Sequence, residues 1–185
     1  IKLPEIPPII GAPSVFYYRN KMEFTFSHKR WLTAEEVKET TEFKKDFALG
    51  MHTPYTYDKI IDLNACYLQT KQTPEILNWF RDFCLTEKLE PYNSNTADGY
   101  LRFLVIREST YTGEIMINLI TKTKETELIE KLGEKLKEKF PNITSFYNSV
   151  YAKLGQVATA EELILVFGNP VISDSILGLK FEISP

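Results

Sequence analysis

The side chains best suited to chemistry are few, and they lie far apart in the sequence. The chain contains two histidines, His28 and His52, and two cysteines, Cys66 and Cys84. A Cys2His2 zinc site would need all four, but their spacing matches no zinc-finger pattern. Each histidine lies in a polar stretch of the sequence, so we expect both at the surface. Cys84 falls on the apolar face of an expected helix and is assigned to the core. Cys66 follows an expected strand. It is either a core residue or one ligand of a site whose other ligands lie outside this sequence.

Motifs of the common enzyme classes are absent from the sequence. It contains no P-loop, no G-x-G-x-x-G, and no G-x-S-x-G, H-E-x-x-H or C-x-x-C pattern. A glycine-rich phosphate cradle of either kind is therefore not supported. Asn142 opens a formal glycosylation sequon, which we interpret as incidental because no secretory signal is visible.

The strongest local signal is electrostatic. Basic side chains and a histidine surround one expected strand and the loop after it: Arg19, Lys21, His28, Lys29 and Arg30. Glu23 is the only acid among them, and aromatic residues are interleaved: Phe16, Tyr17, Tyr18 and Trp31. Cations meet phosphates and rings stack on splayed bases, so this pattern suits RNA. It equally suits a solvated strand edge protected by positive charge, and the residue types alone do not separate the two.

Composition narrows the class of protein. The 185 residues are 43% hydrophobic, 25% charged and 13% aromatic, which is enough apolar material for one domain or two small ones. The formal net charge of −3 excludes a uniformly basic protein that coats nucleic acid. No window approaches the ~18 uninterrupted apolar residues of a membrane span, and two cysteines cannot build a disulfide framework. We therefore expect a cytoplasmic protein with no membrane partner.

The order of the expected helices and strands along the sequence indicates the fold class. Residues 1–14 contain four prolines and predict an extended linker. A short helix with a capping box begins at Thr33, and longer helices are expected at 73–90, with Thr73 as N-cap, and at 124–140. Strands are expected at 15–27, 43–51, 59–63, 100–108, 113–121, 143–154, 163–167, 171–173 and 179–183. Because this order is not a strict β–α alternation, we predict an α+β fold, with a largely antiparallel sheet and helices packed on one face.

Four segments of the sequence are weak signals alone and specific together. They are YRNKMEF at 18–24, LGMH at 49–52 with IIDLNAC at 60–66, the stretch 148–156 with FGN at 167–169 and ISD at 172–174, and LKFEISP at 179–185. In this order they resemble the RNA 5-methyluridine methyltransferases. These enzymes use S-adenosylmethionine to methylate C5 of uridine in ribosomal or transfer RNA.

The resemblance implies that residues 15–185 are the central domain of a longer enzyme, between an N-terminal OB-like domain and a C-terminal methyltransferase domain. The catalytic cysteine, the glutamate base and most of the S-adenosylmethionine site would lie in the C-terminal domain. We therefore expect no catalytic residue in this chain and no activity from it alone. Cys66 matches the fourth ligand of the 4Fe–4S cluster that many ribosomal-RNA members carry, which favours ribosomal over transfer RNA. One thiolate cannot hold a cluster, so we expect none bound here.

The resemblance also implies that the basic strand faces RNA. Arg19 is the first candidate for an RNA contact, Lys21 the second, and Lys29 and Arg30 follow. The alternative is a free-standing α+β interaction module without catalytic activity, in which the same strand serves only solubility. The two hypotheses differ in whether the reading frame continues into a methyltransferase domain.

Overall fold

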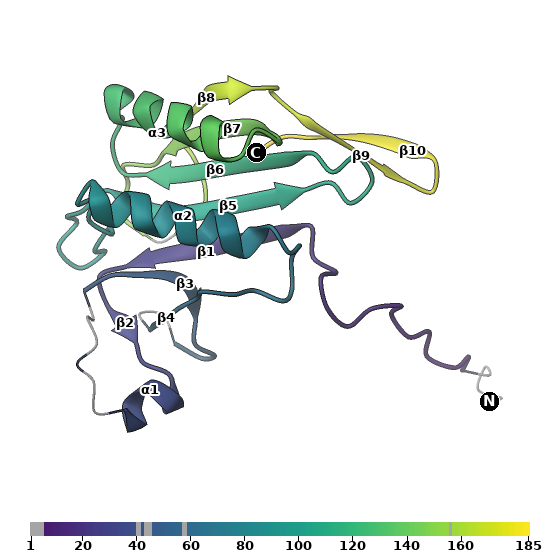
Figure 1. Cartoon of the computed structure of the whole chain (residues 1–185), viewed down its shortest axis with the longest axis horizontal. Helices are drawn as coiled ribbons and strands as arrows, with labels where there is room; N and C mark the ends of the chain where they lie inside the picture. Colours follow the sequence, from purple (N-terminus) through teal and green to yellow (C-terminus); the bar gives the residue numbers. More distant parts are fainter. Residues whose placement is uncertain (1–5, 40–41, 43–45, 57–58, 156) are drawn as a thin grey trace, which may run out of the picture.

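A computed structural model describes residues 6–39, 42, 46–56, 59–155 and 157–185 (Figure 1). Over these residues the helices are α1 (Ala34–Lys38), α2 (Thr73–Thr86) and α3 (Thr126–Lys139). The strands are β1 (Lys21–Ser27), β2 (Arg30–Trp31), β3 (Ala48–His52), β4 (Ile60–Asp62), β5 (Leu101–Glu108), β6 (Ile115–Thr121), β7 (Ile143–Val150), β8 (Glu162–Gly168), β9 (Ile172–Ile176) and β10 (Leu179–Ile183).

The described strands form one large sheet and one hairpin. Eight of them are ordered β2-β4-β3-β1-β5-β6-β7-β8, and β9 pairs with β10 in a sheet of two. All neighbours are antiparallel except β2 with β4 and β6 with β7. The parallel β6–β7 pair requires a crossover connection, which α3 provides. Both α2 and α3 lie on the same side of the sheet (Figure 1). The predicted α+β fold, largely antiparallel with helices on one face, is confirmed.

The main core lies between the sheet and these two helices. Alternate residues of β1 enter it because successive side chains of a strand point to opposite faces, so Met22, Phe24 and Phe26 are buried. The helical positions predicted to be apolar and buried are all in this core: Ile76, Leu77, Phe80, Phe83 and Cys84 of α2, and Ile129, Leu132, Leu136 and Phe140 of α3 or its C-cap. A Cβ at Gly133 would lie 2.8 Å from Val166 Cγ1, so glycine allows α3 to approach β8 closely.

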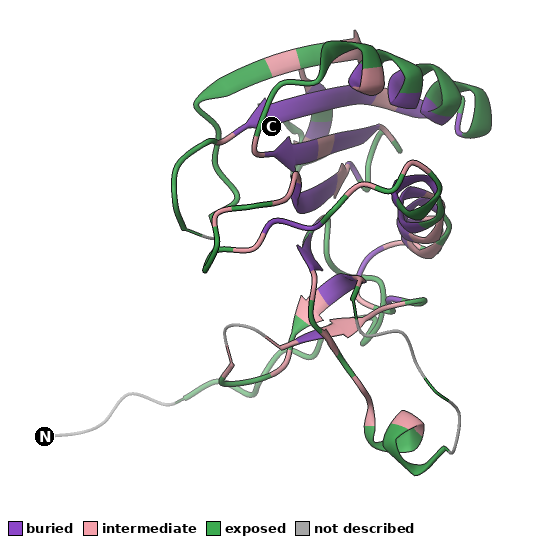
Figure 2. Ribbon diagram, turned by 90° about the vertical axis from the view of Figure 1, so that its left-hand side faces the viewer, coloured by how far each residue is buried: buried purple, intermediate pink, exposed green. Residues whose placement is uncertain are grey.

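The opposite face of the sheet is covered by loops and by the hairpin rather than by helices (Figure 2). Ile172 and Ile183, from β9 and β10, pack with Met116 and Tyr147. Farther along this face, the guanidinium of Arg102 donates hydrogen bonds of 2.6 Å to the carbonyls of Lys153 and Gly155. These bonds fix the loop between β7 and β8 to the sheet. Across the described part of the chain, no helix is long and apolar enough to cross a membrane.

Several predicted boundaries need correction. The first strand begins at Lys21 and not at residue 15, because the backbone of 17–19 bonds to residues 67 and 68 instead of joining the sheet. The N-cap of α2 is Gln72 and not Thr73, since the Thr73 hydroxyl donates to Gln69 Oε1 at 3.1 Å. The strand expected at 143–154 ends at Val150. The capping box at Thr33 is confirmed.

Two predictions fall partly outside the described residues. The first five residues of the expected linker lie there, as do residues 43–45 at the start of the strand expected at 43–51. The remainder of that strand is observed as β3, from Ala48 to His52. Residues 6–14 of the linker are exposed and belong to neither helix nor strand.

Candidate nucleic-acid interface

The four predicted RNA-binding residues lie at opposite ends of β1. Arg19 and Lys21 stand at its start, whereas Lys29 and Arg30 follow its last residue. The seven residues of β1 span about 20 Å at ~3.3 Å per residue. The structure therefore places the four side chains in two separate pairs and not in one patch.

At the start of β1, two cations lie side by side on one face of the sheet, and a third, Arg19, approaches Met22, whose side chain enters the core on the other face. Lys21 is directly opposite Arg107 in the β1–β5 register, and like charges in that position repel one another. Glu23 forms an ion pair with Lys21 and relieves part of this repulsion. Arg19 is exposed, and its Nη1 lies 3.9 Å from Met22 Sδ. Among the described residues no carboxylate forms an ion pair with Arg19.

Arg107 was not among the predicted site residues. The Nε of Arg107 is buried and has no hydrogen-bond partner within the described part of the chain. Only the pairing of β1 with β5 brings Arg107 beside Lys21, and these strands are far apart in the sequence. The pair of Lys21 and Arg107 is therefore where an anion would relieve repulsion at this end.

Three exposed aromatic rings adjoin this end of β1, and we call Phe16, Tyr17 and Tyr67 the aromatic cluster. The ring centroid of Tyr67 lies 6.1 Å from that of Phe16 and 6.4 Å from that of Tyr17, within the range of aromatic pairs. The backbone holds the two segments together, because Tyr17 N donates to Tyr67 O and Arg19 N donates to Leu68 O, both at 2.8 Å. Sequence reasoning missed Tyr67, since neither spacing nor composition signals this pairing.

The other end of β1 is occupied by ion pairs. The guanidinium of Arg30 bonds to Glu36 Oε1, and its Nε lies 3.9 Å from Asp62 Oδ2. The Arg30 side chain is only 16% exposed. Next to it, Lys59 Nζ lies 4.0 Å from the centroid of the Trp31 ring, a cation–π distance. Arg30 thus joins β2, α1 and β4.

Asp62 continues this network into the core. Asp62 Oδ1 accepts hydrogen bonds from Leu49 N at 2.8 Å and from Arg81 Nε at 3.0 Å. Arg81, on α2, also donates from Nη2 to the carbonyls of Leu49, at 3.1 Å, and Leu63. These bonds fix the start of the loop that carries Cys66 and Tyr67.

The histidines and cysteines are not grouped into a metal centre. Within the described residues, no three His, Cys, Asp or Glu side chains are arranged to hold a metal ion. Cys66 and Cys84 are both buried free thiols, and burial raises the pKa of the Cys84 thiol far above its usual range. His52 is exposed, as expected, and its Nε2 lies 3.3 Å from Thr25 Oγ1. A 4Fe–4S cluster takes four thiolates as a rule, so the residues present here do not fit one.

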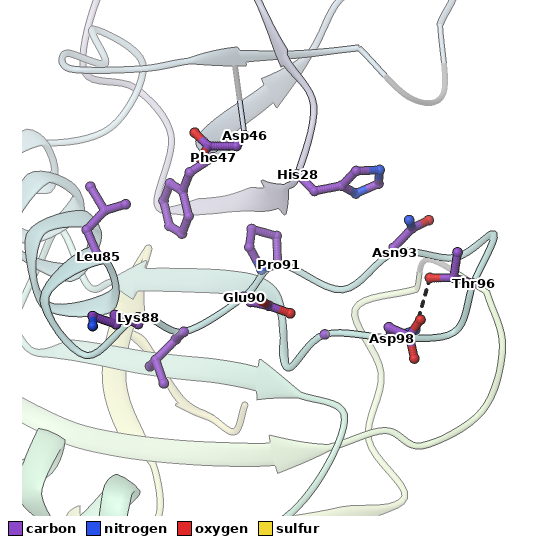
Figure 3. Close-up of a pocket in the computed structure, with 12 residues that line it drawn as sticks. His28, Asp46, Phe47, Leu85, Lys88, Glu90, Pro91, Asn93, Thr96 and Asp98 are labelled. Carbon is purple, nitrogen blue, oxygen red and sulfur yellow. Dashed lines mark hydrogen bonds between the residues drawn. The ribbon is translucent and has the colours of Figure 1, made fainter. Parts of the chain in front are cut away.

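His28 is half-buried rather than fully at the surface, and it borders a cavity of about 460 Å³. Phe47, Leu85 and Pro91 supply apolar walls, while Asn93 and Thr96 lie near the imidazole (Figure 3). Burial lowers the pKa of His28, and the positive charge of Lys29 lowers it further. Both effects favour the neutral imidazole, so His28 adds little positive charge at this end of β1.

No known family model matches the chain. It is 36% identical over 188 aligned residues to a protein of Bacteroides thetaiotaomicron, 34% over 183 to one of Chlorobaculum tepidum and 35% over 188 to one of Porphyromonas gingivalis. All three are named uncharacterized RNA methyltransferases. The alignments cover 98–100% of this chain but only 38–41% of those proteins, so the chain spans about two fifths of their length.

A solved structure shares the fold. It is the Pyrococcus abyssi tRNA (uracil-54, C5)-methyltransferase in complex with S-adenosyl-L-homocysteine, with a TM-score of 0.67 and 20% identity. The match covers 96% of this chain and 37% of the other. Almost the whole chain is thus similar in sequence to part of proteins named RNA methyltransferases, and similar in fold to part of a tRNA methyltransferase.

Proposed function

We propose that the chain is the central, RNA-facing domain of an S-adenosylmethionine-dependent RNA uracil-C5 methyltransferase, and that its substrate is ribosomal RNA. The observation that carries the proposal is the similarity to the Bacteroides protein, which extends over the whole chain at 36% identity. The likeness in fold to a uracil-C5 methyltransferase supports the reaction type. The position of Cys66 in the resemblance supports ribosomal RNA.

In this proposal the chemistry resides in other parts of the longer protein. S-adenosylmethionine supplies the methyl group when it is bound there. The described residues do not fit that cofactor, because α2 begins after Gln72 and α3 after Glu125, neither with a glycine-rich turn after a strand. Residues 15–185 act as the central domain between an OB-like part and a methyltransferase part. The isolated chain binds RNA and transfers no methyl group.

The start of β1 supplies the RNA contact. Arg19 and Lys21 bind phosphates, and Arg107 adds positive charge beside Lys21. Few phosphates are neutralised by so small a group, so binding is weak and decreases steeply with salt. Lys29 and Arg30 contribute less, because Arg30 already pairs with Glu36 and Asp62.

The test is RNA affinity at low salt, measured by fluorescence anisotropy on the 185-residue chain. Arg19→Ala with Lys21→Ala is expected to weaken binding and to reduce the salt slope by ~0.7–0.9 for each phosphate that is no longer neutralised. The matched control is Lys124→Ala with Lys180→Ala, which removes the same charge from two exposed lysines, one just before α3 and one on β10. Equal affinities for the two double variants would contradict the assigned contact.

The substrate class needs a separate measurement with the longer protein that contains this chain. We expect methyl transfer to C5 of uridine in ribosomal RNA and not in transfer RNA, followed by mass spectrometry of digested nucleosides. Methylation of transfer RNA alone would retain the reaction type and reject the ribosomal substrate.

A further inference from the structure

We infer that the aromatic cluster of Phe16, Tyr17 and Tyr67 is a stacking platform that binds unpaired RNA bases. This inference rests on the proposed function, because Arg19 beside the cluster is one of the cations proposed to bind phosphate. It adds a property that cations alone do not provide, which is discrimination between single-stranded and paired RNA.

The cluster is assembled by the fold and is not a chance exposure of single rings. Isolated apolar side chains at a surface are ordinary, but here three rings from two distant segments contact one another. Their exposed fractions are 55% for Phe16, 38% for Tyr17 and 61% for Tyr67. The aromatic contacts of α2, such as those between Trp79 and Phe83 and between Phe80 and Phe146, instead belong to the core or pack against it.

The backbone around the cluster is fixed in advance of any ligand. Tyr17 has a φ of 57°, a left-handed backbone conformation that residues other than glycine seldom adopt. Its amide donates to the carbonyl of Tyr67, which holds it in that conformation. On the other segment, the bonds of Asp62 and Arg81 fix the loop before Tyr67, and Cys66 is 6% exposed. Rings that are ordered beforehand lose little entropy when a base stacks on them.

The charge next to the rings matches a nucleic acid. Arg19 lies two residues beyond Tyr17, and its amide bonds to Leu68 beside Tyr67, so its charge is the one next to the rings. Proteins that bind single strands combine aromatic faces for bases with cations for the backbone. Paired bases present only their edges in the grooves, so the rings gain nothing from a duplex, whereas the cations bind phosphates of either form.

The test compares three RNA probes: a 12-nucleotide single strand, the same sequence as a duplex, and a single strand of equal length in which the central nucleotides lack bases. Tyr67→Ala is expected to lower affinity for the normal single strand about tenfold and to leave the duplex and the abasic strand unchanged. Tyr67→Trp keeps a stacking face and is expected to retain affinity. Tyr55→Ala is the control, since Tyr55 is exposed in the turn after β3 and contacts no described ring.

Phe16→Ala provides a second variant that is independent of the loop at Tyr67, and it is expected to show the same preference. If both alanine variants bind all three probes as the unmodified chain does, the rings do not stack on bases and the surface faces another protein. If they weaken single strand and duplex equally, the inference is also wrong. Failure of the proposed function is distinct, because Arg19→Ala with Lys21→Ala would then leave every probe unaffected.

Discussion

The two ends of β1 have similar sequences and different environments. Each end has two basic residues with at least one aromatic residue near them in sequence, but α1 and β4 lie beside only one of the ends. There, Glu36 and Asp62 take up the charge of Arg30, and Lys59 covers a face of Trp31. At the start of β1, Arg19 and the aromatic cluster remain exposed.

The difference shows that charge counted along a sequence is not charge available to a partner. An Arg that is ion-paired with two carboxylates must give up those contacts before it can bind phosphate, and that loss offsets most of the gain. An exposed Arg without an ion pair has no such bonds to give up. The following predictions test this difference between the two ends.

The largest effect is expected from Asp62→Ala, which disrupts the end of β1 that is held by ion pairs. Removing Asp62 leaves the buried Arg81 without its carboxylate and Arg30 with Glu36 as its acidic partner, so the free energy of unfolding should fall by about 3–5 kcal/mol. Chemical denaturation measures this change. Asp82→Ala is the control, because Asp82 is an exposed acid next to Arg81, and a comparable loss in that variant would argue against a special role for Asp62.

Replacing Arg30 and Arg19 separately by alanine should separate the effect on stability from the effect on RNA binding. Arg30→Ala is expected to lower the free energy of unfolding by about 1–2 kcal/mol through the removal of its charged hydrogen bonds, with RNA affinity almost unchanged. Arg19→Ala should leave stability unchanged and weaken RNA binding about fivefold, equivalent to ~1 kcal/mol. Chemical denaturation measures the stability of both variants, and fluorescence anisotropy measures their RNA affinity. If Arg19→Ala lowers stability and Arg30→Ala weakens RNA binding, the roles assigned to the two ends of β1 are wrong.

A smaller effect is expected from Glu36→Gln, which should make the two ends more alike. Glutamine at this helix position still completes the capping box with Thr33, so the change chiefly removes the charge partner of Arg30. RNA affinity at low salt should rise about two- to threefold, or less than 1 kcal/mol. Glu35→Gln makes the same charge change on an exposed residue of α1. An equal rise in that variant would mean that net charge, and not release of Arg30, is responsible.

The smallest effect is expected on the pH dependence of stability and concerns Glu108. This residue lies beside the start of β1, where its amide donates to the carbonyl of Asn20. Burial raises the pKa of Glu108 above 4.5, and the hydrogen bond from Thr70 Oγ1 only partly opposes this. The folded state therefore keeps the proton to a higher pH than the unfolded state. The stability that this proton confers is complete below pH ~4.5 and is lost as pH rises through the folded pKa.

Glu108→Gln removes this dependence while it keeps an acceptor for Thr70. The variant should match the unmodified chain below pH 4.5 and exceed it at pH 7 by a few tenths of a kcal/mol, the carboxyl being partly screened by solvent. Thermal unfolding between pH 4 and 7 measures the difference. Parallel curves for the two proteins would show that Glu108 is solvated as in the unfolded chain.

The sequence predicts most of the fold because its signals are local. The apolar faces of α2 and α3, the capping box at Thr33 and the β5–β6 hairpin are encoded by periodicity and turn residues within short windows. The start of β1 is missed because residues 17–19 have strand-like side chains but bond to a distant loop. Thr73 is misplaced as N-cap because its hydroxyl has a tertiary partner, Gln69.

The candidate site is less predictable, because its properties depend on which distant segments meet. The cations at Arg19 and Lys21 are visible in the sequence, but Tyr67 and Arg107 join them only through backbone pairing. The carboxylates that occupy Arg30 come from a helix and a strand, and nothing in their spacing marks them as its partners. The RNA-binding role of all four predicted cations stays a prediction.

The place of β1 in the middle of the sheet has a consequence for synthesis of the chain. Residue 21 pairs with residue 107, so β1 lacks one of its two neighbours in the sheet until β5 has been made. At ~5–20 residues per second, this interval lasts on the order of ten seconds. During that time Met22, Phe24 and Phe26 have no complete core to enter. The basic residues at both ends of β1 then act as charged flanks that discourage a nascent hydrophobic strand from pairing with another chain.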